Sequence, residues 1–133
     1  MTNIELVQSL YAAFGRGDVD AILAGLTPDV DWQDYGRASD FPSLGPRHGH
    51  AEVRDFFTVL TGEADFLKFE PRQFHAAGNM VFVLGHSVLL MKRNGREVAT
   101  DWVHVFATVG GKVSNFREFA DTASVSEAWK AAA

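Results

Sequence analysis

Residues 80–109 of the chain read MVFVLGHSVLLMKRNGREVATDWVHVFATV, and this stretch decides the fold. Both of its halves are rich in Val, Phe and Leu, and between them lies Asn94-Gly95, a dipeptide typical of tight β-hairpin turns. Segments 67–75 and 112–119 have a similar composition and are separated from the hairpin by turns that contain glycine. The second half of the sequence therefore predicts consecutive antiparallel strands.

A two-residue turn at Asn94-Gly95 fixes which residues of the hairpin lie opposite one another. It predicts Ser87 opposite Trp102 and Gly85 opposite His104. Because side chains alternate between the two faces of a strand, one face is expected to carry Ser87, Leu89, Trp102, His104 and Phe106. The other face is expected to carry His86, Asp101 and Val103.

The first half of the chain has a helical period. Apolar residues recur at i, i+3, i+4 and i+7 in the segments 7–14, 19–26 and 53–60, which predicts amphipathic helices. Thr2 and Glu5 form a capping box before the first helix, and Gly15-Arg16-Gly17 ends it. Asp18 can cap the second helix, which Thr27-Pro28-Asp29 stops.

Asp34 is the most informative single residue. Alternation over residues 30–35 predicts a strand that places Val30, Trp32 and Asp34 on one inward face. A carboxylate on an apolar face loses the hydration that favours its charge, so its pKa is expected to rise toward the range useful for moving protons. The competing interpretation is a structural carboxylate held by backbone N–H groups or by Arg37 or Arg47.

Helices followed by a curved sheet define a single α+β domain over residues 1–133, with the helices covering one sheet face to form a cone. Residues 36–50, which include two prolines, are expected to form a long irregular loop and a candidate rim or lid of that cone. Ser124 and Glu127 form a second capping box, which predicts a short terminal helix.

Composition restricts the partners. The net charge is −5 with a pI near 5.4, and no basic run occurs, which argues against nucleic acid and anionic membranes and favours a hydrophobic small molecule. No apolar run approaches membrane-spanning length and no signal peptide is evident, so a cytoplasmic location is expected.

No cofactor or metal is expected. The sequence has no phosphate loop, no dinucleotide fingerprint and no cysteine. His48 and His50 fall in the predicted loop, and no histidine pair has the helical i, i+4 spacing of a zinc site.

Over nearly all of its length, the chain resembles the family that includes nuclear transport factor 2, ketosteroid isomerase and the SnoaL-like polyketide cyclases. The resemblance is carried by Tyr11-Ala12-Ala13-Phe14, Gly17-Asp18-Val19-Asp20, Trp32-Gln33-Asp34, Gly49 with residues 53–57, and Gly111-Lys112-Val113. It implies an NTF2-like, cystatin-like cone in which three helices from the N-terminal half pack on a strongly curved antiparallel sheet.

The resemblance also implies roles for individual residues. In ketosteroid isomerase the position matching Asp34 carries the base, Tyr11 matches a tyrosine that donates to the oxyanion, and His104 falls at the second oxyanion donor. Phe57 replaces a tyrosine that supports that enzyme's hydrogen-bond network. In the polyketide cyclases the position of Glu118 carries an acid/base aspartate. Each of these polar residues could instead be structural: a satisfied core histidine or tyrosine, or a glutamate paired with a neighbouring cation.

The candidate catalytic residues are therefore Asp34, His104, Tyr11 and Glu118, and the candidate substrate-binding residues are Trp32, Trp102, Phe106, Phe116, Phe57, Ser87 and Leu89. Together they predict a cofactor-independent acid/base enzyme acting on a small hydrophobic carbonyl compound, of the isomerase, cyclase or dehydratase type. The alternatives are a non-catalytic small-molecule-binding protein and a structural dimer with a vestigial pocket.

The outward sheet face predicts a homodimer. Phe82, Leu84, Val103 and Val105 share that face, and together they are too apolar to leave in water.

Overall fold

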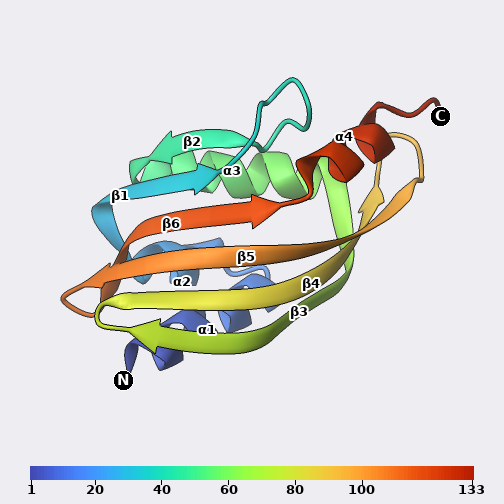
Figure 1. Ribbon diagram of the computed structural model, residues 1–133. Coiled ribbons are helices and arrows are strands. Elements are labelled where there is room, and N and C mark those ends of the chain that lie inside the picture. The colour runs from blue at the N-terminus through green and yellow to red at the C-terminus, as the bar shows by residue number, and fades with distance from the viewer.

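The computed structural model describes residues 1–133 and has helices first and most of the sheet afterwards, as the sequence predicts. Its elements are α1 (Asn3–Gly15), α2 (Val19–Ala24), β1 (Leu26–Asp34), β2 (Gly45–His48), α3 (Gly49–Glu63), β3 (Ala64–Ala77), β4 (Met80–Met91), β5 (Glu97–Val109), β6 (Lys112–Ala120) and α4 (Thr122–Lys130). The strands form one curved sheet in the order β2-β1-β6-β5-β4-β3, and α1, α2 and α3 lie behind it in Figure 1. The predicted α+β class is confirmed.

Local capping chemistry places the first two helices. The predicted capping box is present: Thr2 accepts a hydrogen bond from the Glu5 backbone N–H, and Glu5 accepts one from the Thr2 N–H. Asp18 caps α2 by accepting from the Ala21 N–H. The second helix is shorter than predicted, because after Gly25 the chain already pairs with β6 through the Gly25 carbonyl and the Val113 N–H.

The sheet is antiparallel at every pair except one. β1 runs parallel to β6, with Trp32 opposite Phe116 and Asp34 opposite Glu118. On its other side β1 pairs with β2, a strand that the sequence did not predict. The prediction of an irregular loop over residues 36–50 was therefore wrong beyond residue 44, because residues 45–48 form the edge strand and α3 begins at Gly49.

The predicted hairpin register was wrong by two residues. Gly85 lies opposite Trp102, and Val83 lies opposite His104. The reason is a four-residue connection over residues 92–95, which is closed by the Met91 N–H donating to the Arg96 carbonyl at 2.8 Å. A shift of two keeps every side chain on its predicted face, because the strand period is also two.

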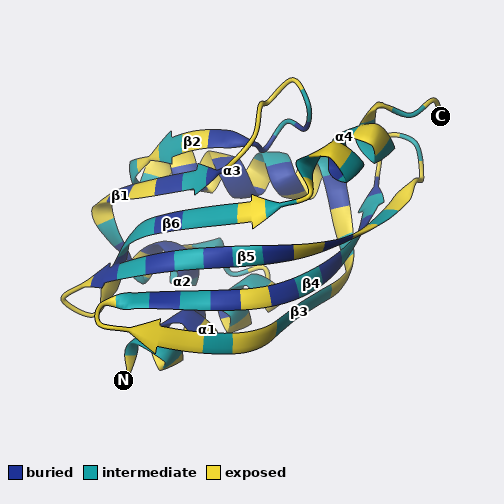
Figure 2. Ribbon diagram, in the orientation of Figure 1, coloured by how far each residue is buried: buried dark blue, intermediate teal, exposed yellow.

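Burial alternates along the central strands, as Figure 2 shows for β4 and β5. The inward residues and the helices form one hydrophobic core of 25 buried residues. None of the helices is long and apolar enough to cross a membrane.

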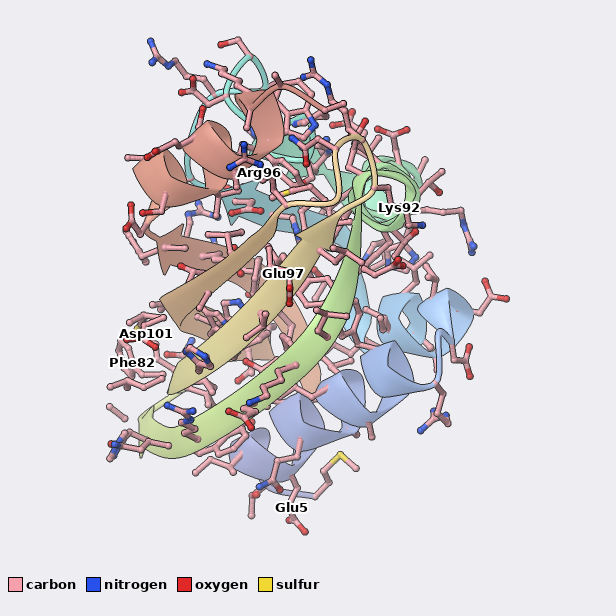
Figure 3. The ribbon with its side chains drawn as sticks, turned by 90° about the vertical axis from the view of Figure 1, so that its right-hand side faces the viewer. Glu5, Phe82, Lys92, Arg96, Glu97 and Asp101 are labelled. Atoms are coloured by element: carbon pink, nitrogen blue, oxygen red, sulfur yellow. The ribbon has the colours of Figure 1, made fainter.

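The outward face of the sheet carries exposed apolar side chains. Figure 3 shows Phe82 and Asp101 projecting from the side of the sheet that faces away from the helices. The side chains of Leu84 and Phe119 are 41% and 49% exposed. The Asp101 carboxylate accepts a hydrogen bond from Nδ1 of His86 at 2.8 Å.

The C-terminal helix α4 lies at the end of the sheet where the β4–β5 connection turns (Figure 1). Its N-cap is Asp121, which accepts from the Ser124 N–H, so Ser124 lies inside the first turn and is not the predicted cap. The Asn94 side-chain amide donates to the carbonyls of Ala128 and Ala131 at 2.8 and 3.0 Å. The residue expected to make a tight turn therefore anchors this helix.

Candidate active site

Three polar residues lie side by side across the inner face of the sheet. Asp34 on β1 is opposite Glu118 on β6, and Glu118 is in turn opposite His104 on β5. Directly opposite residues on neighbouring strands point to the same face and lie about 5 Å apart. The parallel pairing of β1 with β6 therefore brings together the three residues that the sequence singled out separately.

Hydrogen bonds extend this row into a chain of four groups. The Tyr11 hydroxyl, on α1, is 2.8 Å from Nδ1 of His104. Nε2 of His104 is bonded to Oε2 of Glu118, and the Glu118 carboxylate is bonded to the Asp34 carboxyl. We refer to Tyr11, His104, Glu118 and Asp34 as the acid/base chain.

The two carboxyl groups differ in their affinity for protons. Burial raises the pKa of Asp34 well above its usual range, and the negative charge of Glu118 and the hydrogen bond between them raise it further, against a smaller opposing effect of Arg47. Burial would also raise the pKa of Glu118, but the charge of His104 and hydrogen bonds from His104 and Asp34 lower it overall. Asp34 is therefore the carboxyl of the pair that keeps its proton to higher pH, and Glu118 is the one that ionises first.

The hydrogen-bond roles of the other two groups follow from that charge. With Glu118 ionised, Nε2 of His104 donates to it, and in a neutral imidazole Nδ1 then accepts from the Tyr11 hydroxyl. Burial, together with the charge of Glu118, raises the pKa of Tyr11, so its phenol stays neutral. The acid/base chain thus connects a neutral phenol and an imidazole to two carboxyls of different proton affinity.

An aromatic stack fixes the plane of His104. The Trp102 ring is parallel to the imidazole within 19°, with centroids 3.9 Å apart, and Phe69 stacks on the other side of Trp102 at 5.3 Å. The indole crosses Gly85, where an added Cβ would lie 2.2 Å from the ring. Its Nε1–H donates to the Ser87 hydroxyl at 2.7 Å.

A cavity of about 110 Å³ opens beside the acid/base chain. It is lined by 25 residues, of which 18 are hydrophobic. All four candidate catalytic residues line it, and so do all the candidate substrate-binding residues: Trp32, Trp102, Phe106, Phe116, Phe57, Ser87 and Leu89.

Sequence reasoning missed part of the lining. Phe41, Ser43 and Leu44 come from the irregular segment before β2, and Thr122 and Val125 come from α4. The sequence did contain a signal for this part of the lining: Phe41 and Leu44 are apolar side chains close together in an otherwise polar loop, and such residues are seldom left in water together. The segment over residues 36–44 is thus a wall of the cavity as well as a connection.

Neither Asp34 nor Glu118 forms an ion pair with an arginine. Arg37 pairs with Asp40, and Arg47 donates to the backbone carbonyls of Ser43 and Gly45. Arg117 faces outward and pairs with Asp31 at 3.2 Å, so it does not neutralise Glu118.

The remaining histidines are dispersed. His50 contacts the carbonyls of Leu26 and Thr27, His75 contacts Gln73, and His86 contacts Asp101. No three His, Asp or Glu side chains are grouped as a metal ion would require.

The helices and curved sheet have the fold of NTF2-like proteins, as comparisons with known proteins show. The chain belongs to the SnoaL-like domain family, whose model matches residues 7–116. A comparison with curated protein sequences gave no match.

Solved structures of NTF2-like proteins are similar over the whole chain. An NTF2-like protein of unknown function from Burkholderia pseudomallei shares 30% sequence identity and a TM-score of 0.91, with 98% of this chain and 100% of that chain covered. An NTF2-like protein from Burkholderia xenovorans shares 30% identity and a TM-score of 0.87, covering 96% and 95% of the two chains. TerC, co-crystallised with polyporic acid, shares 27% identity and a TM-score of 0.87 over 97% and 98%.

Proposed function

We propose that this protein is a cofactor-independent acid/base enzyme that acts on a small hydrophobic carbonyl compound, in a reaction of the isomerase, cyclase or dehydratase type. The observation that carries the proposal is the continuous acid/base chain, from the Tyr11 hydroxyl through His104 and Glu118 to Asp34, on the wall of an apolar cavity. Groups of opposed proton affinity side by side are what separate acid and base roles require.

The proposed roles follow the direction of each pKa shift. Ionised Glu118, hydrogen-bonded to His104, takes a proton from the carbon next to the carbonyl, and the electron pair of that C–H bond moves to the carbonyl oxygen. Protonated Asp34 then supplies a proton to the resulting enolate at another carbon or at oxygen. The sequence assigned the base to Asp34. In the free protein the raised pKa of Asp34 favours the acid role instead, and one proton transfer between the carboxyls exchanges the two roles.

Electrostatics and exclusion of water supply the rest of the proposed catalysis. Charge that develops on the enolate oxygen is stabilised by hydrogen-bond donors held in place before the reaction, and such donors act more strongly in an apolar site than in water. In the free protein the Tyr11 hydroxyl donates to His104 and His104 donates to Glu118, so Tyr11 and His104 become donors to the enolate when a ligand replaces those bonds. Their relative positions are set by α1, β5 and the aromatic stack before any ligand binds.

The comparisons support a small-molecule ligand. TerC, which shares 27% identity over nearly the whole chain, was co-crystallised with polyporic acid. We therefore propose a hydrophobic small molecule as the partner of this cavity.

The test is proton exchange in deuterated buffer, followed by NMR at the α-carbons of cyclic ketones, enones and polyketide-like esters. The wild type is expected to accelerate exchange for at least one compound. Glu118→Gln, which removes the proposed base, is expected to reduce that rate on the order of 100-fold or more, and Asp34→Asn, which removes the proposed acid, is expected to reduce it as well. Asp101→Asn is the matched control for Asp34→Asn, because Asp101 lies on the outer sheet face and pairs with His86. Equal rates in the wild type and in both carboxyl variants would exclude a role for the carboxyl pair.

A non-catalytic binding protein is the second candidate, and the apolar character of the lining favours it. The same NMR samples separate the two functions. Binding seen as line broadening, without exchange above the buffer rate for any compound, would favour the binding protein.

A further inference from the structure

Two pairs of a tryptophan and a serine line the cavity, and they differ in whether their polar atoms have hydrogen-bond partners. Trp102 and Ser87 satisfy each other, since the indole N–H donates to the serine hydroxyl at 2.7 Å. Trp32 and Ser43 have no hydrogen-bond partner in the protein for Nε1 and Oγ, although both side chains are buried, at 5% and 0% exposed. Buried polar groups almost always have a partner, so the second pair requires an explanation.

Trp32 and Ser43 flank Asp34 along the β1–β2 pair. Trp32 is two residues before Asp34 on β1 and points to the same inner face. Gly45 lies opposite Asp34, and Ser43 is two residues before Gly45, beyond the other side of Asp34. Both residues line the cavity.

The Ser43 position is fixed by its neighbours. Its backbone carbonyl accepts a hydrogen bond from Nη1 of Arg47 at 3.1 Å. Leu44 packs against Gly36, where an added Cβ would lie 2.6 Å from the leucine side chain and where φ is +142°. The hydroxyl is therefore held at the cavity wall by a rigid segment.

The chemistry of the two groups selects the ligand atom. An indole N–H can only donate, and a serine hydroxyl can donate as well, so acceptor oxygens satisfy both. No Lys or Arg lines the cavity, and Glu118 already contributes a negative charge there, which disfavours an anionic ligand. The cavity of about 110 Å³ is somewhat smaller than the engineered apolar cavity of about 150 Å³ that binds benzene, so a single six-membered ring is the largest ring system that suits it.

We infer that Trp32 Nε1–H and Ser43 Oγ–H bind two carbonyl-type oxygens of an uncharged cyclic ligand, one on each side of the Asp34 carboxyl. This inference rests on the proposed function in taking the cavity as the ligand site. It also defines the substrate class more closely, as a cyclic compound with two acceptor oxygens. These oxygens lie on either side of the carbon or oxygen atom to which Asp34 supplies a proton.

The test uses probes that share one ring and differ only in oxygen: cyclohexane, cyclohexanone and cyclohexane-1,4-dione. Dissociation constants are measured by ligand-observed NMR for wild type, Trp32→Phe and Ser43→Ala, and each probe is compared between proteins. Each substitution is expected to weaken binding of the dione about three- to tenfold, as the loss of one neutral hydrogen bond does, and to leave cyclohexane unchanged.

Ser87→Ala is the comparison for stability, because it removes a cavity-lining hydroxyl that accepts a hydrogen bond from the protein itself. This variant is expected to lower the melting temperature of the free protein, since it leaves Trp102 Nε1 unpaired. Ser43→Ala is expected to leave the melting temperature unchanged or raise it, because it removes a hydroxyl without a partner.

The outcomes separate this inference from the proposed function. Unchanged dione binding in both Trp32→Phe and Ser43→Ala would overturn the inference, whether or not α-proton exchange is detected. The partner of the Trp32 N–H would then be the aromatic ring of Phe56 or Phe57, which lie next to the indole. Weakened dione binding without exchange by any compound would uphold the inference while removing the enzymatic proposal.

Discussion

Asp34 and Glu118 lie opposite each other across the one parallel strand pair of the sheet, and their pKa values are shifted in opposite directions. Burial and the negative charge of Glu118 raise the pKa of Asp34, whereas the charge and hydrogen bond of His104 lower the pKa of Glu118. His104 decides which of the two keeps the charge, because it is bonded to Glu118 and not to Asp34.

Asp34→Asn should stabilise the fold in a pH-dependent way. Because folding raises the pKa of Asp34, the folded protein loses stability as pH rises from the ordinary aspartate value, about 3.9, through the raised value. Asparagine cannot ionise, so the gain over wild type should be absent near pH 4 and largest at alkaline pH. Thermal unfolding from pH 4 to 9 measures this difference, and a gain that does not grow with pH would contradict the raised pKa.

Glu118→Gln should lower the pKa of Asp34. The substitution removes a neighbouring negative charge while burial remains, so the pKa should fall but stay above its ordinary value. Carboxyl ¹³C NMR titration of Asp34 in both proteins measures the change. Glu97→Gln, on an exposed residue of β5, is the control and should leave the titration unaltered. An unchanged Asp34 titration in Glu118→Gln would mean that the two carboxyls do not interact.

Gly85→Ala should displace the aromatic stack. The new Cβ would meet Trp102 at 2.2 Å, so the indole must move away from His104, at a cost of about 1–3 kcal/mol in the free energy of unfolding. Gly62→Ala is the control, since nothing lies within 4 Å of its Cβ position in α3 and alanine favours a helix by up to about 1 kcal/mol. Urea denaturation compares the two, and equal stabilities would show that the stack adapts freely.

Leu84→Lys should convert a homodimer into a monomer. We propose that the outer sheet face pairs with a second copy of the chain, because Leu84 and Phe119 are exposed there beside Phe82. Light scattering across a range of concentrations measures the mass of the particle in solution. The control is Val109→Lys at the last residue of β5, where the side chain is 62% exposed. A wild type that remains monomeric at every concentration would contradict the proposal.

Periodicity predicted what is local. The helix starts at Thr2 and Asp18 follow from side chains that reach backbone groups within one turn, and the inward face of β4 and β5 follows from a period of two. The hairpin register failed because the Asn94 side chain bonds α4, a contact from outside the hairpin that no local turn rule includes.

Long-range pairing accounts for the rest of the site. Strand alternation indicated Asp34 and His104, and the family resemblance added Glu118, but their contact depends on β1 lying parallel to β6, which pairs segments distant in sequence. The short edge strand β2 has too few residues for a periodic signal, and Ser43 precedes it in a segment without regular structure. Its burial comes from packing around the cavity, which sequence spacing does not record.

The parallel β1–β6 pairing also makes the ionisation of Asp34 a measure of how far folding has progressed. Contacts between segments this distant in sequence carry a high loop-closure cost and form late on average. A folding intermediate with the β4–β5 hairpin in place but without the β1–β6 contact would leave Asp34 in water with an ordinary acidity. Uptake of a proton by Asp34 during refolding, at a pH between its ordinary pKa and its raised pKa in the folded protein, would then mark the moment at which the sheet closes.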